Sequence, residues 1–73
     1  MNVKGVEITE QQLAAMLQAM GERFRAADVM AAAEAAGVQK GEVAMRAADR
    51  LLQKQRKAGK IKIIASGPYW SSV

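Results

Sequence analysis

The sequence predicts a mainly α-helical domain with a small β-hairpin, in which three helices precede the hairpin. Two observations support this fold class. Apolar residues recur at helical spacing between positions 10 and 58. After Gly59 polar and apolar residues alternate, which is typical of a half-buried strand. We divide the 73 residues into an N-terminal arm, residues 1–8, and one folded domain, residues 9–73. A chain of this size buries roughly 60% of its unfolded surface, so we expect modest stability.

The first helix is predicted to begin at about Glu10. Thr9 and Gln12 have the spacing of a capping box, in which each side chain bonds the backbone amide of the other residue. Gly21 is expected to end the helix. Its core-facing residues recur at i, i+3, i+4 and i+7 and are Leu13, Met16, Leu17 and Met20.

The second helix is predicted from about Arg25 to Ala36, with Gly37 as its terminator. Phe24 precedes it, and we expect this aromatic side chain either to enter the core or to pair briefly with a strand. A tight connection with one apolar residue, Val38, leads to the third helix. The apolar face of the second helix consists of Ala26, Val29, Met30 and Ala33.

The third helix is predicted to be the longest, from about Glu42 to Ala58, and Gly59 ends it. With a rotation of ~100° per residue, the side chains of this helix divide into two faces. The face toward the domain carries small and apolar residues, which are Ala44, Ala47, Ala48, Leu51 and Ala58, with Leu52 at its edge. The opposite face spans an arc of roughly 100°. It carries long polar and basic side chains, which are Arg46, Arg50, Gln53, Lys54 and Lys57.

The hairpin is predicted from the alternation in residues 60–63, a turn at residues 65–68 and a returning strand from Tyr69 to the C-terminus. Pro68 has no amide hydrogen to donate, so it belongs in the turn or on a free strand edge. Because the chain has only three aromatic residues, we expect Trp70 to face the core and Tyr69 to be partly exposed.

Positive charge is concentrated in the second half of the chain. Residues 1–38 carry three basic and five acidic side chains, whereas residues 39–73 carry eight basic and two acidic ones. A polarised distribution of this kind is an electrostatic footprint for a polyanion. The alternative is a solvated helix face that serves only solubility.

The residue types that the chain lacks disfavour several classes of protein. Without cysteine or histidine, it has no thiolate or imidazole metal ligands. There is no glycine-rich phosphate loop, and the serines have no histidine partner. We therefore expect a protein without a cofactor that is not an enzyme. No secretory signal or membrane span is visible, which favours a cytoplasmic location, and the alanine content suggests a bacterial or phage source.

The order helix, helix, helix, hairpin resembles the winged-helix family of DNA-binding domains, and the resemblance extends from Ile8 to Val73. Phe24 lies where that family has a short first strand. The turn and the start of the recognition helix are matched by Gly37-Val38 and Val43, and the start of the wing by Gly59 and Ile61. The resemblance implies a three-helix winged helix-turn-helix fold. It also implies a bacterial or phage transcriptional regulator or accessory factor, with the third helix in the major groove of double-stranded DNA.

Under this resemblance, the third helix and the wing supply the DNA contacts. Arg46 and Arg50 are expected to read guanine with paired hydrogen bonds, and Lys54 and Lys57 to contact phosphates. Gln53 is an undetermined polar contact. The full set of predicted DNA-binding residues is Lys40, Arg46, Arg50, Gln53, Lys54, Lys57, Lys60 and Lys62.

The sequence is also compatible with two other functions. A winged-helix interaction module would dock an acidic protein partner on the same basic face. An RNA-binding protein would prefer single strands and would use Tyr69 for stacking. A homodimer or a complex with a protein partner is also expected, because a single small module buries little DNA surface. The outer face of the first helix, with Ala15 and Ala19, and the edge of the wing are the candidate pairing surfaces.

Overall fold

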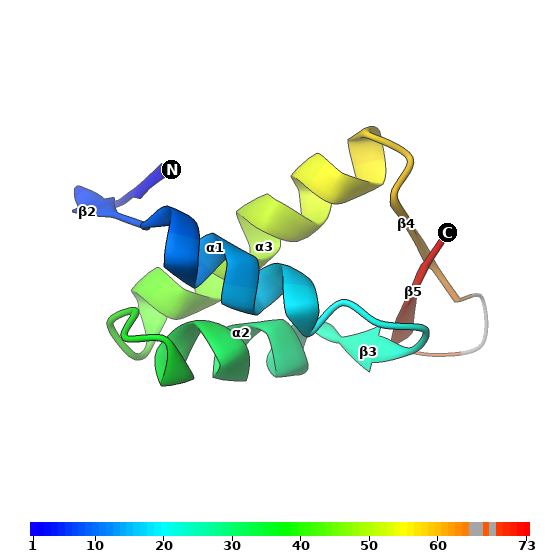
Figure 1. The fold of residues 1–73 in the computed structure, drawn as a ribbon, viewed down its shortest axis with the longest axis horizontal. Coiled ribbons are helices and arrows are strands. Elements are labelled where there is room, and N and C mark those ends of the chain that lie inside the picture. Colours follow the sequence, from blue (N-terminus) through cyan, green and yellow to red (C-terminus); the bar gives the residue numbers. More distant parts are fainter. Residues whose placement is uncertain (65–66, 68) are drawn as a thin grey trace.

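The computed structural model describes residues 1–64, 67 and 69–73, which form three helices and two small antiparallel sheets. The molecule measures 33 × 20 × 18 Å, and the two sheets lie at opposite ends of its long axis (Figure 1). The predicted three helices and C-terminal hairpin are confirmed, whereas the first sheet was not predicted. The helices are α1 (Glu10–Gln18), α2 (Ala26–Ala35) and α3 (Glu42–Lys57). The first sheet pairs β1 (Asn2–Val3) with β2 (Val6–Glu7). The second has the order β3-β5-β4, from β3 (Phe24–Arg25), β4 (Ile61–Ile63) and β5 (Tyr69–Ser72).

Helix α1 begins at the predicted capping box. The Thr9 amide donates to Gln12 Oε1 at 2.9 Å, and the Gln12 amide donates to Thr9 Oγ1 at 3.2 Å. Met16 and Met20 are buried as predicted. Leu17 was expected in the same stripe but is 42% exposed, because it lies about 100° around the helix from Met16, on the solvent side of α1.

The turn between α2 and α3 closes with a Schellman motif. The Val38 amide donates to the Ala33 carbonyl at 3.0 Å, and the Gly37 amide donates to the Glu34 carbonyl at 3.1 Å. Gly37 has φ +99°, a left-handed conformation that favours glycine. Val38, the residue after Gly37, is buried. The predicted terminator is therefore confirmed.

The inner faces of α2 and α3 match the prediction except at their ends. Val29 and Ala33 of α2 are fully buried, but Ala26 is exposed because it is the first residue of the helix, next to strand β3. Ala58 was expected on the inner face of α3 but is exposed, because the helix ends at Lys57. The buried face of α3 consists of Val43, Ala44, Ala47, Ala48, Leu51 and Leu52. Within the described residues, no helix is both long enough and apolar enough to cross a membrane.

Strand β3 completes the C-terminal sheet. Phe24 is buried and also pairs with Trp70, so it fulfils both roles expected from the sequence. Ile61 is buried, whereas Ile63 is 61% exposed although the alternation placed both on one face. Ile61 and Ile63 lie on the same face of the strand, but only Ile61 belongs to the buried cluster of the helices. Trp70 packs partly against this cluster, as predicted. The predicted turn includes residues 65, 66 and 68, which lie outside the described residues.

The first eight residues, set apart as an arm in the sequence analysis, are packed on the domain. Lys4 and Gly5 connect β1 and β2 with positive φ angles of 51° and 81°, which is the geometry of a two-residue type I′ hairpin. Val3 and Ile8 belong to the buried cluster. Residues 2–7, which we call the N-terminal hairpin, are thereby held beside α3, which β1 contacts (Figure 1).

Candidate nucleic-acid interface

The N-terminal hairpin and α3 enclose an open groove of about 550 Å³. Lys4 comes from the hairpin turn, and the other four cations of the groove come from the outer face of α3. One carboxylate, that of Asp49, is also part of the lining. The lining residues are Val3, Lys4, Arg46, Asp49, Arg50, Gln53, Lys54 and Lys57. Five of the eight residues predicted to bind DNA are therefore brought together.

The polar face of α3 is assembled by helical spacing, as expected. Its high amphipathicity follows from alanine and leucine on one side and basic residues on the other. Lys54 and Lys57 are exposed and form no ion pair within the described residues. Gln53 Oε1 instead accepts two hydrogen bonds from Arg56, at 3.1 and 2.9 Å. Within the described residues Lys4, Arg46 and Arg50 each form a side-chain hydrogen bond, whereas Lys54 and Lys57 form none.

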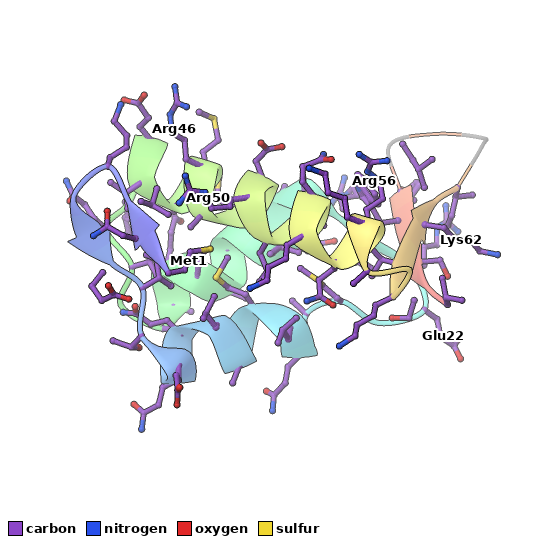
Figure 2. The ribbon with its side chains drawn as sticks, turned by 90° about the horizontal axis from the view of Figure 1, so that it is seen from above. Met1, Glu22, Arg46, Arg50, Arg56 and Lys62 are labelled. Atoms are coloured by element: carbon purple, nitrogen blue, oxygen red, sulfur yellow. The ribbon has the colours of Figure 1, made fainter. Side chains whose placement is uncertain are left out.

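Arg50 connects α3 to the N-terminal hairpin. Its Nη1 donates a hydrogen bond to the backbone carbonyl of Asn2, 48 positions earlier in the chain. Figure 2 shows Arg50 beside the segment that begins at Met1. A guanidinium has five N–H donors, and within the described residues Arg50 uses one of them, so the others are available for an external acceptor. Arg50 thus has a structural role that the sequence analysis did not predict.

Glu42 accepts hydrogen bonds from both sides of the groove. Its Oε1 lies 2.7 Å from Lys4 Nζ and 3.2 Å from Arg46 Nε. The hydrogen bonds from Lys4 and then from Arg46 lower the pKa of the Glu42 carboxyl below its ordinary value of 4.5. All three side chains remain about half exposed, so solvent and salt screen these pairs.

The lowered pKa of Glu42 predicts a pH-dependent difference between the protein and Glu42→Gln. A carboxyl whose pKa is depressed by folding stabilises the fold above its unfolded pKa, and this contribution is lost as the pH falls through the folded pKa. We expect the melting temperature of Glu42→Gln to lie below that of the parent protein at neutral pH. The two should converge well below pH 4.5. Thermal melts followed by circular dichroism across this range test the expectation.

Glu10→Gln is the matched control, because Glu10 is also the first residue of its helix. It removes the same helix-terminal charge, and Glu10 forms no ion pair within the described residues. If the Glu42→Gln and Glu10→Gln proteins show the same pH profile, the lost stability comes from the helix terminus and not from Lys4 and Arg46.

Three of the predicted DNA-binding residues lie outside the groove. Lys40 precedes α3, Lys60 follows it, and Lys62 lies on β4; all three are exposed. Figure 2 shows Lys62 at the end of the molecule opposite to Arg46. Lys4 was not predicted as a site residue, and its neighbour Gly5 was the one local signal for a hairpin turn.

A second group of basic residues lies on the C-terminal sheet and was also missed. The guanidinium of Arg23 lies 4.0 Å from the centre of the Tyr69 ring, and that of Arg25 lies 5.9 Å from it. Arg25 also approaches Asp28, with 4.0 Å between Nε and Oδ2. Cation–π contacts of this kind stabilise a partly exposed aromatic ring, as that of Tyr69 is. These arginines provide charge-matched control positions for the groove.

The comparisons with known proteins yield no relative. No protein-family model matches the chain, and no curated protein or solved structure matches it either. Within residues 1–64, 67 and 69–73, no three histidine, cysteine, aspartate or glutamate side chains are grouped so that they could hold a metal ion.

Proposed function

We propose that this protein is a small winged-helix protein that binds double-stranded DNA, as a transcriptional regulator or accessory factor. The observation that carries the proposal is that, among the described residues, five cations and a single carboxylate line one groove. The order α1, β3, α2, α3, β4, β5 supports the winged-helix assignment, because the short strand β3 pairs with the hairpin that follows the third helix.

Helix α3 has the dimensions that the major groove of DNA requires. A helix with its side chains is about 10–12 Å across, and the major groove is about 12 Å wide. Arg46 and Lys57 are eleven residues apart, which corresponds to about 16 Å along the helix. At about 3.4 Å per base pair, this length extends over roughly five base pairs. The polar face of α3 is therefore long enough to contact a short recognition site.

The side chains of α3 divide into two roles in this proposal. Arg50 keeps most of its donors unpaired and reads a guanine edge, for which arginine is the commonest partner. Lys54 and Lys57 neutralise phosphates, which position the protein without reading sequence. Lys60 and Lys62 contact the DNA backbone beside the major groove that α3 occupies.

Salt dependence of duplex binding tests the proposal. If four lysines each neutralise one phosphate, log K falls with log salt at a slope of about −3.6. Affinity for a random duplex should then fall about 150-fold between 50 and 200 mM salt. Fluorescence anisotropy with a labelled duplex measures the slope. The Arg23→Ala protein should give the same slope, because Arg23 lies against Tyr69 on the sheet. No duplex binding at the lower salt concentration would refute the proposal.

One observation favours docking of an acidic protein partner as a second candidate. The Glu42 carboxylate already binds Lys4 and Arg46 beside the groove, so the site accommodates a carboxylate. A short polyglutamate peptide that binds with higher affinity than the duplex at equal salt would favour this function. Weaker binding of the peptide would favour DNA.

A further inference from the structure

Lys4 and Arg46 reach one oxygen atom from two separate parts of the chain. Lys4 lies in the turn of the N-terminal hairpin and Arg46 on the second turn of α3, 42 positions later. Both donate to Glu42 Oε1, at 2.7 and 3.2 Å. Both also line the groove, whereas Glu42 does not. The two cations therefore form a pair of donors directed at an anion at the rim of the groove.

The position of Lys4 is determined by structure around it and not by its ion pair alone. The type I′ turn orients Lys4, and Val3 beside it is 3% exposed. The hydrogen bond from Arg50 to the Asn2 carbonyl holds the first strand against α3. A donor held in this way loses less conformational entropy on binding than a free lysine side chain.

We propose that Lys4 and Arg46 form a phosphate-binding site, which we call the Lys4–Arg46 fork, and that Glu42 is an internal anion that competes with the phosphate. This inference deepens the proposed function and rests on it, because the phosphate belongs to the DNA backbone beside α3. It moves Arg46 from base reading to backbone binding and adds the N-terminal hairpin to the interface.

The exchange of a carboxylate for a phosphate is chemically direct. Both anions accept charge-assisted hydrogen bonds from lysine and arginine, and the fork remains half exposed. Replacing Glu42 therefore requires little additional desolvation, since water already reaches all three side chains. In the free protein Glu42 holds the side chains of Lys4 and Arg46 in place through its hydrogen bonds. In the complex it weakens phosphate binding, because it is a like charge next to the ligand.

Glu42→Gln is expected to bind a random duplex about tenfold more tightly than the parent protein, because the like charge beside the bound phosphate is gone. Its salt slope should steepen by about 0.9 for each fork cation that gains a phosphate. Glu10→Gln makes the same change in net charge at the first residue of α1. It should leave affinity within about twofold, since Glu10 pairs with neither fork cation within the described residues and salt screens an exposed charge.

Adding Lys4→Ala to Glu42→Gln should remove most of the gain in affinity and reduce the steepness of the slope by about 0.9. Melting temperatures establish that each variant is folded before binding is measured. If the duplex affinity of Glu42→Gln equals that of Glu10→Gln, or if Lys4→Ala has no effect in the Glu42→Gln background, the fork is refuted while the proposed function stands.

Inorganic phosphate supplies a second test that does not depend on DNA. In ¹H–¹⁵N spectra of Glu42→Gln, titration with phosphate should shift the resonances of Lys4 and Arg46 more than those of Arg23 and Arg25. The same titration of the Lys4→Ala, Glu42→Gln protein should shift Arg46 less. Shifts at the fork without duplex binding by any variant would support a site for free phosphate and refute the DNA proposal. Equal shifts at both pairs of residues would refute the fork.

Discussion

Replacing both Lys54 and Lys57 by alanine is expected to weaken binding to a random duplex roughly 100-fold. Each lysine is exposed and forms no ion pair within the described residues, so each is available to a phosphate. A hydrogen bond to a charged group contributes about 1.5 kcal/mol or more, and 1.4 kcal/mol is tenfold in affinity. The salt slope should become less steep by about 1.8. Anisotropy titrations at fixed salt measure both quantities.

The matched control for this pair is Arg23→Ala with Arg25→Ala, which makes the same change in net charge on the C-terminal sheet. Affinity should change less than about threefold, since the guanidinium groups of both arginines already contact the Tyr69 ring and that of Arg25 also approaches Asp28. The loss caused by the lysine pair should also be the same for unrelated duplexes, because phosphates carry no sequence information. Equal losses from both pairs would show that net charge, and not the groove, determines binding.

Leu52→Ala is expected to lower the free energy of unfolding by about 2–5 kcal/mol. Leu52 is among the largest fully buried side chains, with 2% exposure, and its truncation leaves a cavity between closely packed helices. At about 0.05–0.15 kcal/mol per residue, a domain of this length has a total stability of roughly 4–11 kcal/mol. The expected loss is therefore a large fraction of the total stability of the domain. Urea denaturation followed by circular dichroism measures the loss.

Leu17→Ala is the control for this prediction. The same truncation at the exposed Leu17 on α1 should cost less than about 1 kcal/mol, because little apolar surface is removed from the interior. If Leu17→Ala destabilised the protein as much as Leu52→Ala, the assignment of Leu17 to the solvent side of α1 would be wrong.

The elements that could be predicted are those whose signal is local in the chain. The bounds of α2 and α3 agree with the prediction to within one residue. The capping box at Thr9 and the terminator Gly37 are both confirmed. These features depend on residues within one or two helical turns of each other, where spacing alone decides which groups can meet.

The errors lie where an element ends or where a residue depends on distant neighbours. Ala26 and Ala58 have the correct phase for the buried face but stand at the ends of their helices, where no second element covers them. Ile63 has the correct phase for its strand but lies beyond the buried cluster. Periodicity predicts which side a residue faces, whereas exposure depends on what covers that side.

The amino-acid sequence by itself determined the three helices, the C-terminal hairpin and the row of cations along α3, because each follows from periodic spacing within one segment. Only the tertiary structure decided that the N-terminal hairpin becomes the second wall of the groove. Strands of two residues carry no alternation that can be detected, and the bonds from Lys4 to Glu42 and from Arg50 to Asn2 join positions 38 and 48 residues apart. Such contacts form because burial of Val3 and Ile8 places the hairpin beside α3.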